Sequence, residues 1–96
     1  MTYTVLIDEL VLEDDLKRVG PRDRTRIFKA IREKLTTEPD RYGQPLRGGL
    51  KGYWKLRVGE FRVIYEIQKE KIVVYVIKVG LRRNEEVYRE VLKRLG

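Results

Sequence analysis

Basic side chains are concentrated in one part of this 96-residue chain, between residues 47 and 65. Five lysines and arginines fall there against a single acidic residue, so the stretch carries +4 of the chain's net charge of +7. A sheet face that only needs solvation mixes charges of both signs, whereas clustered cations favour binding to phosphate groups. We therefore predict a phosphate-binding surface, which by itself separates neither RNA from DNA nor a binder from an enzyme. The five residues are Arg47, Lys51, Lys55, Arg57 and Arg62.

The chain contains no histidine and no cysteine. It therefore lacks the commonest general base, the commonest metal ligand and any possibility of a disulfide framework. Any catalysis has to use Lys, Arg, Tyr, Asp or Glu, and we expect no metal and no cofactor. The carboxylates at Asp14, Asp15, Glu85 and Glu86 are expected on helix surfaces and at helix ends, where their spacing indicates neither a metal site nor an acid/base pair.

The register of one predicted hairpin determines how the cations are arranged. Gly59-Glu60 fits a two-residue turn with glycine at its first position. With this turn, Arg57 lies opposite Arg62, and Lys55 projects from the same side of the sheet. Two arginines directly opposite each other repel, so this pairing by itself destabilises the sheet. The next strand ends before Arg82 and Arg83, which add two cations at the sheet edge.

The remaining sequence supplies the elements that would position these residues. Hydrophobic spacing and turn residues predict the order β-α-α-β-β-β-α, which is a small, single α+β domain. Its sheet is mainly antiparallel, with an N-terminal helical hairpin packed on one face and a C-terminal helix. The predicted elements are a strand at 2–7, helices at 8–19 and 21–37, strands at 54–58, 61–67 and 72–79, and a helix from 84 to 95, with residues 38–45 as a loop.

Each predicted helix has an apolar side at helical spacing. Trp54 and Tyr65 lie on the apolar face of the predicted hairpin and are expected in the core. Asn84 is expected to cap the last helix. The expected buried helix residues are Leu12, Leu16 and Val19 in the first helix, Ile27, Phe28, Ile31 and Leu35 in the second, and Val87, Val91, Leu92 and Leu95 in the last.

The sequence favours a cytoplasmic protein. Its first residues lack the basic and then apolar layout of a signal peptide. The longest apolar run, residues 72–77, is far too short to cross a bilayer. We therefore expect no membrane partner.

Two segments resemble the RelE/ParE toxin superfamily. The first is PLRGGLKGYWKLRVGEFRVIY, residues 45–65, with the superfamily's Pro-Leu-x-Gly opening followed by Leu-Arg-Val-Gly-x-Phe-Arg and a tyrosine. The second is VIKVGLRRNEEVY, residues 76–88, which is similar to the Val-Gly-x-Arg…Val-Tyr ending. Because element order and length also agree, the resemblance covers nearly the whole chain and implies one RelE-like toxin domain, residues 1–96.

Similarity to the RelE branch implies the toxin of a toxin–antitoxin pair. Such a toxin is a metal-independent endoribonuclease, an mRNA interferase that cleaves mRNA on the ribosome and so inhibits translation. A ribose 2′-OH attacks the adjacent phosphate, which requires a base, charge stabilisation and protonation of the leaving oxygen. By resemblance, Lys55 is the general base, Arg62 holds the phosphorane oxygens, Arg82 stabilises the leaving group, and Tyr88 orients the 2′-OH or stacks on a base.

The sequence departs from the family pattern at two positions. Tyr53 replaces the first of two strand lysines, so Lys51 in the preceding loop is an alternative base to Lys55. Asn84 replaces a basic residue, which removes one phosphate contact. Tyr88 also has the helical spacing of a core residue. Further RNA or phosphate contacts are expected from Arg47, Lys51, Arg57 and Arg83.

The resemblance also implies the partners. These are the ribosome, mRNA and ribosomal RNA, and a RelB-like cognate antitoxin that docks on or displaces the last helix. The toxin is expected as a monomer or in a complex with the antitoxin. Two alternatives use the same scaffold: a ParE-like inhibitor of DNA gyrase, and a non-catalytic nucleic-acid-binding relative.

Overall fold

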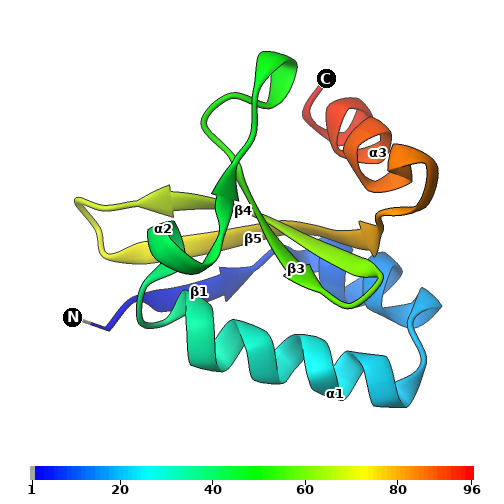
Figure 1. Cartoon of the computed structure of the whole chain (residues 1–96), viewed down its shortest axis with the longest axis horizontal. Coiled ribbons are helices and arrows are strands. Elements are labelled where there is room, and N and C mark those ends of the chain that lie inside the picture. Colours follow the sequence, from blue (N-terminus) through cyan, green and yellow to red (C-terminus); the bar gives the residue numbers. More distant parts are fainter. Residues whose placement is uncertain (1) are drawn as a thin grey trace.

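Five strands form one sheet in the order β1-β5-β4-β3-β2 in the computed structural model, which describes residues 2–96 (Figure 1). Strand β1 pairs with β5 in parallel, and every other neighbouring pair is antiparallel. The predicted α+β class with a mainly antiparallel sheet is confirmed. The strands are β1 (Thr4–Ile7), β2 (Gln44–Pro45), β3 (Trp54–Val58), β4 (Phe61–Gln68) and β5 (Val73–Leu81).

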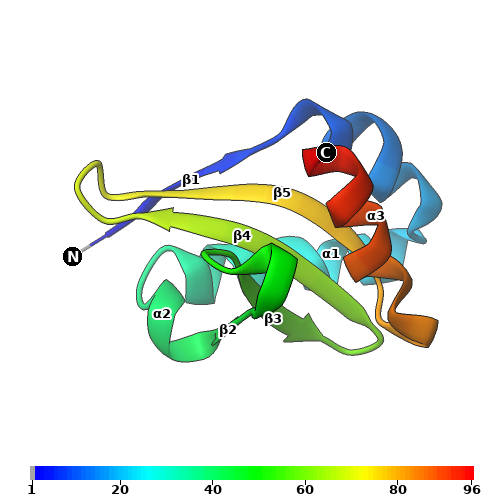
Figure 2. The ribbon, with the colours of Figure 1, turned by 90° about the horizontal axis from the view of Figure 1, so that it is seen from above.

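The helices flank the sheet on both faces (Figures 1 and 2). After β1, a π-helical turn (Val11–Asp15) continues into a 3-10 turn (Leu16–Arg18). Helix α1 (Pro21–Ala30) begins with a first-turn proline and continues as a π-helical turn (Ile31–Leu35). Helix α3 (Glu86–Leu95) ends the chain. No helix in the described part is long and apolar enough to cross a bilayer.

The segment between α1 and β3 is more structured than predicted. Residues 38–45, predicted as a loop, contain the short helix α2 (Pro39–Tyr42) and the edge strand β2. The Tyr65 hydroxyl donates a hydrogen bond of 2.6 Å to the Pro39 carbonyl. A buried side chain of β4 thereby binds the first residue of α2. A 3-10 turn (Gly48–Leu50) then leads to β3.

The predicted β3–β4 register is confirmed. Arg57 pairs with Arg62, and Val58 pairs with Phe61 across the two-residue turn. Gly59 has a φ of +58°, a left-handed conformation that glycine adopts without steric cost. The turn therefore places the cationic residues on one face of the sheet, as expected.

Two hydrophobic clusters lie on opposite faces of the sheet. The larger cluster joins the N-terminal helices to one face and includes Tyr65, which is fully buried as predicted. The smaller cluster packs α3 on the other face through Val87 and Val91 against Ile64 and Ile77. A β-bulge between Ile64 and Tyr65 leaves Ile77 without a register partner in β4. The face that carries α3 is also the face that carries the cations.

Several predicted core positions are wrong. In the first helical segment the π-helical turn shifts the buried side, so that Val11 and Asp15 are buried. Asn84 does not cap α3, because no side-chain cap hydrogen bond forms there. Four residues predicted to be buried are exposed: Leu12, Phe28, Leu92 and Leu95.

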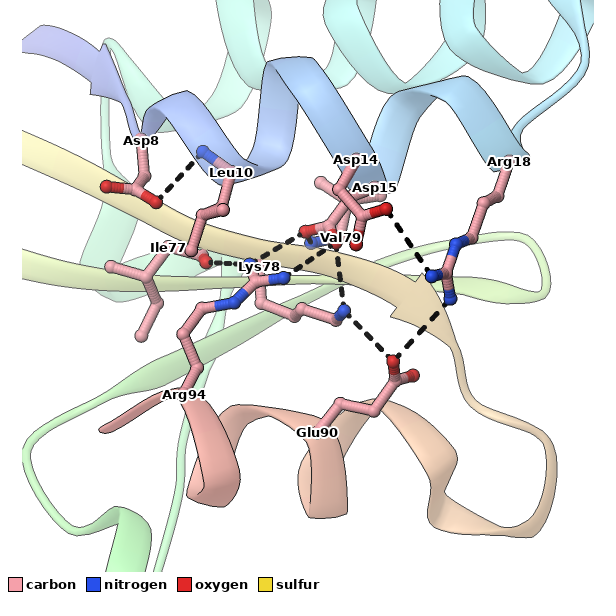
Figure 3. A network of polar contacts seen from close by, with 10 residues as sticks. All are labelled: Asp8, Leu10, Asp14, Asp15, Arg18, Ile77, Lys78, Val79, Glu90 and Arg94. Carbon is pink, nitrogen blue, oxygen red and sulfur yellow. Dashed lines mark hydrogen bonds and ion pairs between the residues drawn. The ribbon is translucent and has the colours of Figure 1, made fainter. Parts of the chain in front are cut away.

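Asp15 forms the centre of a buried ion-pair network, which corrects its predicted place on a helix surface (Figure 3). Its side chain accepts two hydrogen bonds from Arg94, of 3.0 and 3.1 Å, and one of 2.9 Å from the Lys78 ammonium. The Val79 N–H donates to the same carboxylate at 2.9 Å. Lys78 also contacts Glu90 at 3.3 Å. The network joins the first helical segment, β5 and α3.

The network also sets the ionisation of Asp15. Burial alone would raise its pKa, but hydrogen bonds from Arg94, Lys78 and Val79 N–H outweigh burial and hold the pKa below its ordinary value. Arg94 additionally donates a hydrogen bond of 2.8 Å to the Ile77 carbonyl. Ile77 and Val79 lie on β5 past the end of its pairing with β1. The Ile77 carbonyl and the Val79 N–H thereby have hydrogen-bond partners, and the end of α3 is bound to the sheet.

Candidate active site

One pocket of about 300 Å³ lies between the cationic sheet face and the start of α3. The four residues predicted to be catalytic all line it, although they come from four different segments of the chain. Lys55 lies on β3, Arg62 on β4, Arg82 directly after β5, and Tyr88 on α3. The remaining lining residues are Asn84 and Glu85, so three cations face one carboxylate.

Lys55 and Tyr88 meet across this pocket. The Lys55 ammonium lies 5.8 Å from the centre of the Tyr88 ring, within cation–π range. Tyr88 is partly exposed and also packs against the smaller hydrophobic cluster. Its core role and its place in the pocket are therefore compatible.

Arg62 is the most buried of the four residues, at 8% exposure. One terminal nitrogen of its guanidinium donates to the Gly59 carbonyl at 3.0 Å and to the Phe61 carbonyl at 2.9 Å. These bonds fix the guanidinium at the hairpin end. An arginine held in this way presents its remaining N–H groups without further loss of side-chain freedom.

Arg82 is positioned by its backbone and lies exposed at the pocket. Its N–H donates a hydrogen bond of 2.9 Å to the Glu60 carbonyl, which joins the end of β5 to the hairpin turn. The next residues form a tight turn in which Asn84 and Glu85 both have left-handed φ values, of 54° and 56°. Asparagine adopts this conformation readily and glutamate does not, so the turn stores strain beside the pocket.

Gly80 permits the close approach of α3. A Cβ built on Gly80 would lie 3.1 Å from Val87 Cγ2 and 3.2 Å from Val87 Cβ. Since Gly80 pairs with Arg62 in the sheet, this contact lies next to the pocket. The missing side chain therefore allows Tyr88, one residue after Val87, to reach the cations.

Two further pockets adjoin the first along the same face. A pocket of about 220 Å³ is lined by Tyr42, Gln44, Arg57, and by Lys55 and Arg62, which it shares with the first. A pocket of about 440 Å³ near β2 also reaches Lys55 and contains Arg47. Of the predicted phosphate-binding residues, Arg47 and Arg57 thus lie beside the first pocket. The other two, Lys51 and Arg83, are exposed and line none of the three.

Four residues that line the first two of these pockets were not predicted as site residues. Asn84 and Glu85 were interpreted as helix-end residues, and Tyr42 and Gln44 lay in the predicted loop. The only sequence feature that could have indicated these four residues is their position next to segments that contain lysines or arginines. The turn before α3 brings Asn84 and Glu85 to the pockets, and the segment at the edge strand β2 brings Tyr42 and Gln44. Neither element can be predicted from residue spacing.

The pocket has the groups needed for chemistry on a phosphodiester. Clustered cations stabilise developing negative charge on phosphate oxygens, and a lysine or a carboxylate can accept a proton. Among residues 2–96, no three Asp or Glu side chains gather closely enough to form a metal site. Lys55, Arg62 and Arg82 are the cations that line this pocket.

The comparisons with known proteins agree with this architecture. A family model described as "ParE toxin of type II toxin-antitoxin system, parDE" matches residues 8–86. The mRNA interferase toxin RelE of Escherichia coli is 36% identical over 96 residues, covering 99% of each chain. The toxin–antitoxin complex RelBE2 from Mycobacterium tuberculosis aligns with a TM-score of 0.79 and 32% identity, covering 85% of this chain and 100% of that one. A mutant E. coli RelE toxin in its free state aligns over 100% of both chains, with a TM-score of 0.74 and 32% identity. The chain therefore belongs to the RelE/ParE superfamily of toxins.

Proposed function

We propose that this protein is the toxin of a toxin–antitoxin pair and an endoribonuclease that cleaves mRNA bound to the ribosome. The observation that carries the proposal is the meeting of Lys55, Arg62, Arg82 and Tyr88 in one pocket. The relatives named mRNA interferase support the same reaction class. The substrate is a single-stranded mRNA segment whose phosphate enters the pocket.

The reaction is an internal transfer at one phosphate. A base removes the 2′-OH proton, the 2′ oxygen bonds to phosphorus, and the bond to the 5′ oxygen breaks. The products are a 2′,3′-cyclic phosphate and a 5′-OH, once the leaving oxygen takes a proton. Arg62 holds the phosphorane oxygens, Arg82 stabilises the leaving oxygen, and Tyr88 orients the ribose or stacks on its base.

Two groups in the pocket are candidates for the base. Lys55 is favoured over Lys51, because Lys51 does not line this pocket. Glu85 is the one carboxylate among the lining residues, and it forms none of the ion pairs found within residues 2–96. If Lys55 is the base, Lys55→Met abolishes cleavage while Glu85→Gln retains it. The reverse result assigns the base to Glu85.

We also infer that an antitoxin neutralises this protein. The relatives include RelE toxins solved in complex with RelB antitoxins. The positive charge of this chain suits an acidic partner segment. The exposed Leu92 and Leu95 on α3 offer such a segment an apolar contact. Co-expression with a RelB-like antitoxin that binds this chain should relieve the growth arrest caused by the toxin, and persistent growth arrest would contradict the inference.

The decisive experiment follows mRNA integrity on programmed ribosomes with wild type, Arg82→Ala and Arg89→Ala. Arg89 is an exposed α3 arginine that lines none of the three pockets, so its variant is the matched control. Loss of one charge-stabilising donor lowers rates by roughly 10²–10³-fold, and we expect that loss only for Arg82→Ala. Intact mRNA with folded wild type would reject the nuclease. Relaxed or broken DNA in a gyrase assay would then establish the ParE-like alternative. The matching family model, which is described as a ParE toxin, supports testing that alternative.

A further inference from the structure

A second recess continues from the proposed active site toward the edge of the sheet. It has a volume of about 220 Å³ and shares Lys55 and Arg62 with the active-site pocket. Its other lining residues are Tyr42 at the end of α2, Gln44 on β2 and Arg57 on β3. When a phosphate of an RNA strand lies between Lys55 and Arg62, the neighbouring nucleotide of that RNA therefore lies in this recess.

Tyr42 is not needed for the core. Its side chain is 49% exposed, and it belongs to neither hydrophobic cluster nor to the residues packed against them. The interior beneath α2 is filled by Tyr65, whose hydroxyl bonds to the Pro39 carbonyl. The Lys34 ammonium lies 5.8 Å from the Tyr42 ring centre, so one cation also borders the ring on the side of the π-helical turn that contains Lys34.

The charge of the recess suits a nucleotide. It is lined by three cations and no carboxylate. Arg57 is exposed, lies directly opposite Arg62, and takes part in none of the ion pairs of residues 2–96. Gln44 adds an amide, which offers both a donor and an acceptor to the edge of a base.

We propose that this recess is a subsite for the nucleotide that flanks the scissile phosphate of the mRNA. The base stacks on Tyr42, its phosphate binds Arg57, and the Gln44 amide contacts the edge of the base. Exposed aromatic rings beside arginines are the usual means by which proteins hold unpaired bases. This subsite rests on the proposed nuclease function, since it positions the strand for that reaction.

The test measures single-turnover cleavage on programmed ribosomes over a range of toxin concentrations. Tyr42→Ala is expected to raise the half-saturating concentration by roughly 5- to 100-fold, the usual contribution of one stacked base, with a saturating rate close to wild type. Tyr42→Phe retains the ring and should match wild type. Phe28→Ala removes an exposed aromatic that lines none of the three pockets and is the control.

An abasic nucleotide in the mRNA identifies what the ring contacts. Placing it on either side of the scissile phosphate in turn should reproduce the loss at one of the two positions with wild-type protein. At that position Tyr42→Ala should cause no additional loss.

Unchanged affinity of Tyr42→Ala would overturn the subsite while leaving the nuclease intact. Full additivity with both abasic mRNAs would also overturn it, because the ring would then contact ribosomal RNA. Absence of cleavage by wild type would reject the proposed function and the subsite together.

Discussion

Replacing Asp15 with alanine removes one carboxylate from four hydrogen bonds at once (Figure 3). Lys78 and Arg94 lose their buried partner, and the Val79 N–H is left without an acceptor. Lys78 then keeps only Glu90, at 3.3 Å and closer to solvent. Breaking a buried ion pair by deleting one partner typically costs about 3–5 kcal/mol, because the remaining charge is uncompensated.

That cost is large for a domain of this length. At roughly 0.05–0.15 kcal/mol per residue, the free energy of unfolding is about 5–14 kcal/mol. With an m-value of roughly 2 kcal/mol per M, the urea midpoint should fall by about 1.5–2.5 M. Because Arg94 anchors α3, cleavage should also decline as Tyr88 loses its support.

Asp14→Ala is the matched control, since it removes the same group one residue earlier. Asp14 is about half exposed and lies 3.4 Å from Arg18, which is also exposed. An exposed pair of this kind contributes about 1 kcal/mol or less. Equal urea midpoints for Asp14→Ala and Asp15→Ala would refute the assignment of the network as a stabilising centre.

Three further outcomes are expected. Because the folded-state pKa of Asp15 is lowered, its contribution is complete above the ordinary value of 3.8 and is lost as the pH falls below it. Wild type should therefore lose stability below about pH 4 more steeply than Asp15→Asn, as measured by urea unfolding at a series of pH values. Gly43→Ala would place a Cβ 1.7 Å from the Tyr65 hydroxyl oxygen, so unfolding should be easier by about 1–3 kcal/mol or more, whereas Gly20→Ala has open space and should not show this loss. Arg57→Ala should reduce the slope of log affinity for RNA against log salt by about 0.7–0.9, and an unchanged slope would exclude a phosphate contact.

The hairpin and its cationic face could be predicted from sequence because strand alternation and the Gly59 turn act together. A period of two and a turn of fixed length leave only one register, and Arg57 must then face Arg62. The contact between Lys55 and Tyr88 could not be predicted from strand alternation and turns, because tertiary packing positions α3. That part of the site was available only through the family resemblance.

The buried network could not be predicted for a physical reason. A regular α-helix repeats every 3.6 residues, and this period places Leu12 on the buried side with Leu16. The π-helical turn adds a residue to the turn, so that Val11 and Leu16 share the buried side and Asp15 joins them. At the other end of the chain, Arg94 bonds to the Ile77 carbonyl, while Leu92 and Leu95, which were expected to be buried, are exposed.

The Asp15–Arg94 contact spans 79 positions of a 96-residue chain and thereby affects when this protein can assemble during its synthesis. Strand β1 is made first, yet it pairs with β5, which is made among the last elements. Such long-range pairing slows folding, because the entropy of closing a long loop is lost before the contact forms. The nascent chain cannot close this contact until residue 94 has left the ribosome. Because α3 carries Tyr88, the pocket can be complete only after residues 86–95 have been synthesised and have emerged from the ribosome.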